Sequence, residues 1–199
     1  MQEQNNKTPD IKIFVVCHKP SYIPENLYLY PVQVGTALAS MKLPGMLYDN
    51  DGDNISEKNK TYCELTAQYW AWKNVEADYY GFFHYRRYFS FDTNAHNEDI
   101  WGNIVYENIS DQAIRDMKLY PEEMKKIITQ YDAISVKGRE YPDLKENGQK
   151  MDVYHEYGEA SFQHREDLDK TLEVLLSKYP EFKEVTEWYM KSNKAHECN

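Results

Sequence analysis

Two adjacent arginines and a histidine stand among aromatic residues at the end of an apolar run. The stretch GFFHYRRYF, residues 81–89, places His84, Arg86 and Arg87 directly after a glycine and two phenylalanines. Guanidinium groups donate planar, bidentate hydrogen bonds to phosphate or carboxylate oxygens, and they stay charged at any physiological pH. The residue types therefore predict an anion site. The alternative is that both arginines pair with surface carboxylates, which are plentiful in this chain.

The overall charge means that any anionic ligand must meet a local cationic cluster. The 199-residue chain has a formal net charge of −10. This charge disfavours nonspecific binding to nucleic acid or to anionic lipid, because a phosphate-binding surface must present positive potential. Only five arginines occur, and two of them are Arg86 and Arg87. The motif HYRR is therefore the leading candidate for the anion site, and nucleic acid is not an expected partner.

The cysteines and the N-terminal sequence indicate the cellular compartment in which the protein is expected. Cys17, Cys63 and Cys198 are odd in number and have no CxxC spacing, so neither a disulfide framework nor a zinc site is expected. The N-terminal sequence MQEQNNKTPD is polar, and no apolar run approaches the ~20 residues of a membrane span. A soluble, cytoplasmic protein is expected.

Short apolar runs alternate with amphipathic stretches along the chain. Their lengths and β-branched or aromatic residues predict buried strands at 11–17, 78–84 and 131–136. Periodicity and capping residues predict helices over 62–74 and 121–130, further helices from 165 and from 180, and a helical turn or two near 32–39. This alternation predicts a mostly parallel α/β sheet flanked by helices, in a single domain over 11–199 that follows a flexible polar tail, 1–10.

The predicted elements place HYRR at the carboxyl end of a strand, which is where open α/β sheets bind their ligands. Alternation along an extended strand would send Arg86 and Arg87 to opposite sides, so the chain must turn by Tyr85 for both to reach one ligand. The preceding helix, 62–74, is expected to pack an apolar face against the sheet. That face is made of Tyr62, Leu65, Tyr69 and Trp72, with Trp70 also in the core.

Three longer motifs carry a family resemblance. The segments GDNISEKNKTYCELTAQYWAWKN, DYYGFFHYRRYF and YHEYGEASFQHREDLD resemble bacterial glycosyltransferase domains found in capsular polysaccharide and O-antigen gene clusters. The resemblance extends from residue 11 to the last residue. It implies a GT-A-like, Rossmann-type fold that binds a nucleotide-sugar donor. Members of this family typically continue with an apolar segment beyond the position of Asn199, so a missing C-terminal segment is expected.

The resemblance also bears on metal dependence. Many GT-A enzymes hold a divalent metal on the donor diphosphate through an Asp-x-Asp motif after a central strand, but the comparable position here reads His84-Tyr85-Arg86. It therefore implies a metal-independent mechanism in which Arg86 and Arg87 neutralise the diphosphate. Asp51 and Asp53 have Asp-x-Asp spacing in a polar turn, which leaves a Mn²⁺ or Mg²⁺ site open as the alternative.

The remaining site residues follow from the same resemblance. Glu166 and Asp167 stand in the first turn of a predicted helix, as does the acidic pair that supplies the base in many inverting GT-A enzymes, and Asp167 is the expected base. The alternative is that both acids complement the helix dipole. The expected donor-binding residues are His18, Asp53, Asn54, Ser56, Asn59, His84, Arg86 and Arg87. Helix capping is the alternative for Ser56 and Asn59.

The activity that the resemblance implies is transfer of a hexose from a nucleotide sugar, a UDP-sugar, to a growing surface polysaccharide or a lipid-linked oligosaccharide. Such a protein would make at most peripheral contact with the inner face of a membrane. A non-catalytic nucleotide- or carbohydrate-binding module and an aromatic-rich interaction domain are the alternatives. Donor turnover separates the enzyme from both of them.

Overall fold

The structure is a computed structural model that describes residues 8–99 and 102–196. The chain divides into two compact units. Unit 1 comprises Met1–His96 and Val105–Ile134, and unit 2 comprises Asn97–Ile104 and Ser135–Asn199. Most of the predicted polar tail, residues 1–7, lies outside the described residues.

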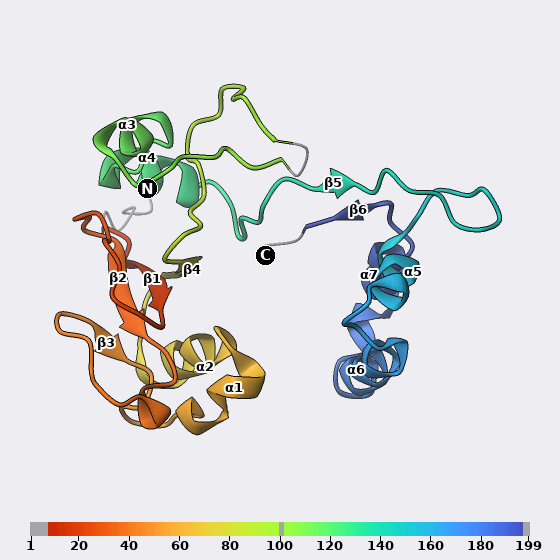
Figure 1. Cartoon of the computed structure of the whole chain (residues 1–199), viewed down its shortest axis with the longest axis horizontal. Coiled ribbons are helices and arrows are strands. Elements are labelled where there is room, and N and C mark those ends of the chain that lie inside the picture. The colour runs from red at the N-terminus through yellow and green to blue at the C-terminus, as the bar shows by residue number, and fades with distance from the viewer. Residues whose placement is uncertain (1–7, 100–101, 197–199) are drawn as a thin grey trace, which may run out of the picture. The chain divides into compact units, whose positions relative to one another are not determined.

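Unit 1 is built on a four-stranded, all-parallel sheet with the order β3-β2-β1-β4 (Figure 1). The strands are β1 (Ile11–Cys17), β2 (Leu29–Gln33), β3 (Leu47–Tyr48) and β4 (Tyr79–His84). The predicted strands 11–17 and 78–84 are confirmed and are neighbours in the sheet. Gly81 of β4 lies opposite Ile13 of β1, and a Cβ atom there would be 2.9 Å from Ile13 Cγ1, so this position has no room for a side chain.

Helices cover both faces of the sheet because β1 is apolar on both sides. Alternate β1 side chains, such as Ile13 and Val15, pack with α3 (Asp111–Asp116) and α4 (Pro121–Ile128). The intervening Phe14 and Val16 pack with α2 (Leu65–Asn74). A parallel strand buried on both faces is typical of an α/β sheet. The predicted α/β class, a parallel sheet flanked by helices, is confirmed.

Short elements connect the strands. The 3-10 helix η1 (Thr36–Leu38) follows β2, and η2 (Ser56–Lys58) leads into α1 (Asn59–Tyr62). The helix predicted over 62–74 is α2, which begins at Leu65. Tyr62 is the last residue of α1, and Cys63, with a left-handed φ of 47°, separates the two helices.

The predicted buried face of this helix is wrong. The residues that α2 buries are Thr66, Ala67, Trp70 and Ala71. Trp72 is 68% exposed, and Leu65 and Tyr62 are also exposed. Ala67 and Ala71 are small enough to bring the helix close to the sheet, so they form the contact face with Trp70, whereas Tyr69 and Trp72 contact each other outside it.

The strand predicted at 131–136 is also wrong, because those residues form no strand. Tyr131 is 56% exposed and Ile134 is partly exposed. Residues 131–134 line one cavity together with residues 79–83 of β4, so this segment lies beside the sheet edge without joining its ladder.

Unit 2 consists of helices and a small antiparallel ladder. Its helices are α5 (Val153–Glu159), α6 (Arg165–Lys178), η3 (Pro180–Phe182) and α7 (Lys183–Met190), and its strands are β5 (Arg139–Glu140) and β6 (Lys194–Ala195). The predicted helix starts at 165 and 180 are confirmed. Asp152 caps α5 by accepting a hydrogen bond from His155 N. Hydrogen bonds from Lys145 and His155 outweigh the effect of its burial and lower the pKa of Asp152.

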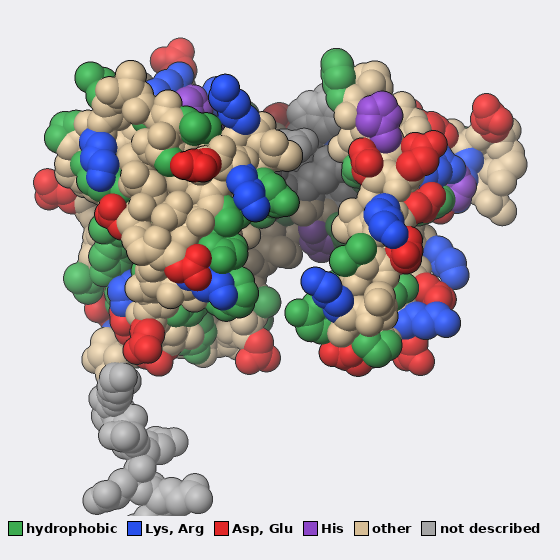
Figure 2. Space-filling model, turned by 90° about the horizontal axis from the view of Figure 1, so that it is seen from below, with side chains coloured by type: hydrophobic (Ala, Val, Ile, Leu, Met, Phe, Trp, Pro, Cys, Tyr) green, Lys and Arg blue, Asp and Glu red, His purple; other side chains and the backbone are tan. Residues whose placement is uncertain are grey.

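Charged side chains of both signs are interspersed over the face of the molecule that Figure 2 shows. Among the residues that the structure describes, no helix is long and apolar enough to cross a membrane.

Candidate functional site

The carboxyl ends of β1 and β4 bring separate parts of the chain together. The two strands are parallel neighbours, and the Tyr85 amide donates a hydrogen bond to Val16 O at 3.1 Å. His18 and Tyr85, the residues that follow the two strands, therefore lie side by side. β1 continues toward β2 on one side and pairs with β4 on the other, so this edge is a switch point of the topology, the usual ligand position in open α/β sheets.

A tight turn follows β4, and it confirms that the chain turns at Tyr85. The Arg87 amide donates a hydrogen bond to His84 O at 2.9 Å, and the Arg86 amide donates to His84 Nδ1 at 3.3 Å. Both arginine side chains are exposed. Within residues 8–99 and 102–196, neither guanidinium forms an ion pair with a carboxylate.

Cationic and imidazole groups surround the buried ring of Tyr85. The His18 ring centroid is 5.3 Å from that of Tyr85 and 6.5 Å from that of His84. Lys19 Nζ and Arg86 Cζ lie 5.5 Å and 5.3 Å from the Tyr85 centroid. We name His18, Lys19, His84, Tyr85 and Arg86 the Tyr85 cluster. Its positive charge at the sheet edge suits an anionic ligand.

The surroundings of His84 favour its neutral form. Burial lowers the pKa of His84, the charge of Arg87 lowers it further, and the opposing charge of Glu64 does not restore it. Because the Arg86 amide donates to Nδ1, the neutral imidazole carries its proton on Nε2. That nitrogen lies 4.0 Å from Glu64 Oε1.

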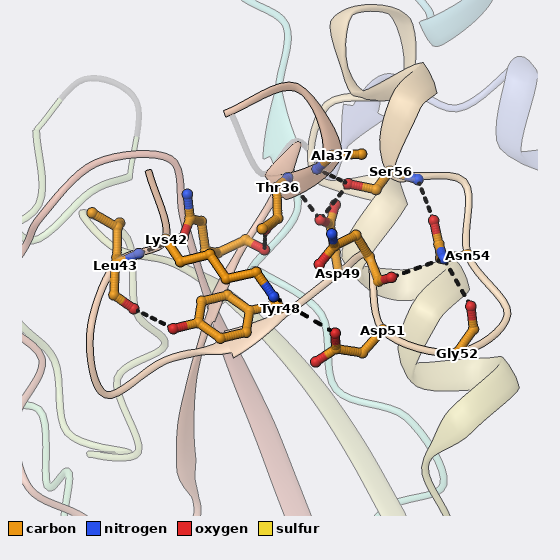
Figure 3. Close-up of polar contacts among 12 residues, drawn as sticks. Thr36, Ala37, Lys42, Leu43, Tyr48, Asp49, Asp51, Gly52, Asn54 and Ser56 are labelled. Atoms are coloured by element: carbon orange, nitrogen blue, oxygen red, sulfur yellow. Dashed lines mark hydrogen bonds and ion pairs between the residues drawn. The ribbon is translucent and has the colours of Figure 1, made fainter. Parts of the chain in front are cut away.

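The loop after β3 is organised by a buried carboxylate (Figure 3). Asp49 accepts hydrogen bonds from the amides of Gly35 and Thr36 at 2.8 Å and 3.0 Å. The hydroxyls of Ser56 and Thr66 donate to the same carboxylate at 2.6 Å and 2.7 Å. Ser56 is fully buried, and its oxygen also accepts from the Ala37 amide at 3.1 Å. The Ser56 hydroxyl thus joins η1, η2 and β3 and is turned inward.

The other predicted donor-binding residues of this loop bond to the loop itself or to α2. The Asn54 amide group donates to Asn50 O and Gly52 O at 3.1 Å and 2.8 Å. Asn59 donates to Cys63 O at 2.8 Å, which supports the turn at the end of α1. Asp53 Oδ1 accepts from the Tyr69 hydroxyl at 3.1 Å. Of the predicted donor residues in the loop, Asn59 is linked to the HYRR turn, because it bonds to Cys63 and the next residue, Glu64, lies 4.0 Å from His84.

Among the described residues, the Asp-x-Asp pair gathers no further metal ligands. Asp51 lies 3.9 Å from Lys42 Nζ, and Asp53 contacts Tyr69. No group of three or more His, Cys, Asp or Glu side chains within the described ranges is arranged to hold a metal ion.

Glu166 and Asp167 lie in unit 2, in the first turn of α6 as expected, and both are exposed. The Asp167 amide bonds to His164 O at 3.0 Å. This position complements the helix dipole, and it also leaves both carboxylates free to accept a proton.

Sequence reasoning missed Lys19 and Asp49, and it placed Glu64 only on the side of its helix nearer the surface or the site, without a partner. Lys19 follows His18 at the end of β1, so its neighbour's position already gave a signal for it. Asp49 and Glu64 act through contacts with residues 13 to 20 positions away, and single acids in a polar loop carry no local signal.

Comparisons with known proteins show which family this chain belongs to and which solved structure it is similar to. The family model described as "Domain of unknown function (DUF4422)" matches residues 12–199. The chain belongs to this family. The match spans both units, so the DUF4422 domain includes the parallel sheet and the helices of unit 2.

The DUF4422 domain is also similar to a solved structure, the apo form of WbbM, a bifunctional glycosyltransferase. The TM-score is 0.83 and the sequence identity 30%, over 96% of this chain and 33% of that one. The chain therefore spans about a third of WbbM. The comparison with curated proteins gave no match. The similarity confirms the predicted GT-A-like α/β fold as that of a glycosyltransferase structure.

Proposed function

We propose that this DUF4422 domain is a glycosyltransferase that uses a nucleotide-sugar donor, a UDP-hexose. The observation that carries the proposal is the similarity to the bifunctional glycosyltransferase WbbM over 96% of the chain. The cationic Tyr85 cluster at the switch point of the sheet supports it, since a nucleoside diphosphate is an anion that this edge suits. The acceptor is a growing surface polysaccharide or a lipid-linked oligosaccharide, reached from the cytoplasm.

The donor diphosphate binds at the HYRR turn in this proposal. Arg86 and Arg87 are exposed and unpaired with carboxylates in the described residues, so their donors are available to phosphate oxygens. His18 and Lys19 supply further donors at the end of β1, and the loop residues Asp53, Asn54 and Asn59 are the proposed further contacts. Ser56 is buried and bonded to Asp49, so it positions this loop without touching the donor. The arginines stabilise the charge that develops on the leaving nucleotide without a metal ion.

Transfer requires a base for the acceptor hydroxyl. In an inverting reaction, the acceptor oxygen forms a bond to the anomeric carbon while its proton passes to a carboxylate. The bond from the anomeric carbon to the phosphate oxygen breaks, and its electron pair leaves with UDP. Asp167 is the proposed base and Glu166 its acidic neighbour, because both carboxylates are exposed in the first turn of α6.

Thermal-shift measurements with a panel of nucleotides and nucleotide sugars, with and without EDTA, test the proposal. They examine the donor class and the metal dependence of binding together. UDP and at least one UDP-hexose should raise the melting temperature, and EDTA should leave the shift unchanged. Release of UDP from the same UDP-hexose, with a saccharide acceptor, then measures turnover. In the same assays, Arg86→Ala and Arg87→Ala test the donor site, and Arg115→Ala is their matched control. Arg115 is an exposed arginine of α3 whose side chain bonds only to nearby Gln112 among the described residues.

The outcomes separate the alternatives. Binding of UDP-hexoses with no release of UDP would assign the non-catalytic module. A shift that EDTA abolishes and Mn²⁺ restores would move the donor site to the loop of Asp51 and Asp53. No shift with any nucleotide would refute the proposal.

A further inference from the structure

Glu64 is held beside the Tyr85 cluster by an unusual stretch of backbone. The preceding residue, Cys63, has φ 47° and ψ −126°, a conformation that residues other than glycine rarely adopt. Asn59 donates to Cys63 O at 2.8 Å, which stabilises this break between α1 and α2. Strained residues of this kind persist where the surrounding structure holds them, and they cluster at ligand sites. Here the break turns Glu64 toward the carboxyl end of β4.

Glu64 and His84 present opposite hydrogen-bonding groups to the same space. Neutral His84 offers a donor at Nε2, because its Nδ1 accepts from the Arg86 amide. Glu64 offers a carboxylate, which accepts only. The two atoms are 4.0 Å apart, too far for a direct hydrogen bond. Glu64 is 49% exposed and His84 12%, so the pair opens to solvent on the carboxylate side.

An oxygen that both accepts and donates fits between them. A hydroxyl placed about 2.8 Å from each atom would accept from His84 Nε2 and donate to Glu64. A phosphate does not fit this polarity, because its oxygens only accept and the carboxylate repels them. The neighbouring Arg86 and Arg87 suit the phosphate instead.

We propose that Glu64 and His84 together bind one hydroxyl of the donor's sugar. This inference rests on the proposed function, in which the diphosphate occupies the adjacent HYRR turn and so brings its sugar within reach of the pair. Glu64 is then a specificity-determining residue, which selects a hydroxyl over a hydrogen atom or a phosphate at one position of the hexose ring.

The test compares UDP with the UDP-hexose that the thermal-shift panel identifies, by calorimetry on the full chain. Glu64→Ala should weaken the UDP-hexose at least tenfold and leave UDP within about twofold, because only the sugar reaches the pair. His84→Ala should also weaken the UDP-hexose at least tenfold, but it does not serve as the UDP-neutral variant, because His84 accepts a hydrogen bond from the Arg86 amide in the diphosphate-binding turn. The matched control is Glu57→Ala, an exposed carboxylate on η2, which should change neither affinity. Unchanged melting temperatures exclude a folding defect.

Deoxy analogues of the same donor identify the hydroxyl. One analogue should bind the wild type at least tenfold more weakly than the parent sugar, and Glu64→Ala should bind the two equally. Equal loss of UDP and UDP-hexose in Glu64→Ala, or equal binding of UDP and every UDP-hexose by the wild type, would overturn the inference while leaving nucleotide binding intact. Failure to bind UDP at all would instead refute the proposed function.

Discussion

Replacing Asp49 with asparagine keeps the size of a buried side chain and removes part of its hydrogen bonding. Each carboxylate oxygen accepts from one backbone amide and one hydroxyl, at Gly35 and Thr66 or at Thr36 and Ser56. An amide nitrogen in place of either oxygen leaves one buried backbone N–H without an acceptor, which costs about 1–3 kcal/mol.

The second consequence of Asp49→Asn is the loss of charge. The bonds that remain are neutral rather than charge-assisted, which weakens them by about 1 kcal/mol. The displaced hydroxyl recovers part of this loss, since Thr66 Oγ1 also lies 3.1 Å from Cys63 O. The substitution should therefore destabilise the protein by about 2–4 kcal/mol.

Urea unfolding followed by circular dichroism measures this loss. With a slope of about 2 kcal/mol/M, the midpoint should fall by about 1–2 M. Asp51→Asn is the control, because Asp51 is exposed and its ion pair with Lys42 spans 3.9 Å. Exposed pairs contribute about 0–1 kcal/mol. A midpoint for Asp49→Asn that equals that of Asp51→Asn would show that the network does not hold the loop.

Three further predictions concern the site and the core. Arg86→Ala or Arg87→Ala should weaken UDP binding by about 1.5–3 kcal/mol in calorimetry, with only partial rescue by lysine, because an ammonium lacks the planar fork; full affinity in both alanine variants would place the phosphates elsewhere. Trp70→Ala should lower stability by about 3–5 kcal/mol in urea unfolding and Trp72→Ala by less than about 1 kcal/mol, since only Trp70 is buried; equal losses would contradict the assigned helix face. The pKa of His84 is lower in the folded protein than in the unfolded chain. As the pH falls below about 6.5, the unfolded chain therefore binds a proton that the folded protein does not, and the free energy of unfolding decreases. His84→Gln should lose less stability than the wild type between pH 7.5 and 5.5, and parallel pH profiles would contradict this assignment.

Local patterns predicted the central strand β1 because it is buried on both sides. IKIFVVC is apolar in both alternating sets, and each set has its own cluster of packed side chains. β2 escaped prediction because Pro31 interrupts LYPVQ. The structure accommodates this proline because its nitrogen, which cannot donate a hydrogen bond, faces away from β1. Alternate residues of a strand direct their amides to opposite sides. The Val34 amide bonds to Cys17 O on the β1 side, so Pro31 faces the other side, where β3 pairs only from Val32 onward.

The errors arose where composition alone does not specify a partner. YDAISV has the β-branched character of a strand, but its pairing depends on an available ladder, and in the structure it packs beside β4 without one. In α2, aromatic side chains outweighed alanines in the predicted apolar face. The helix buries Ala67 and Ala71 because small residues permit close approach to the sheet.

The candidate site was predictable where its residues follow strands. His18 and His84 stand at the ends of β1 and β4, and the parallel arrangement brings both to one edge. The helical period places Glu64 nearer the surface or the site, but its contact with His84 was not predictable, because that contact depends on the left-handed φ of Cys63. No sequence pattern announces such a break in a residue other than glycine.

The central place of β1 has a consequence for synthesis of the chain. β1 is made before the other strands of its sheet, but its partner β4 ends at His84 and the helices of one covering layer extend to Ile128. At ~5–20 residues per second, translation of residues 18–84 takes about 3–13 s. During that interval the segment IKIFVVC has an unpaired edge and apolar side chains on both faces. The nascent chain thus exposes an aggregation-prone strand until β4 and the covering helices have been made.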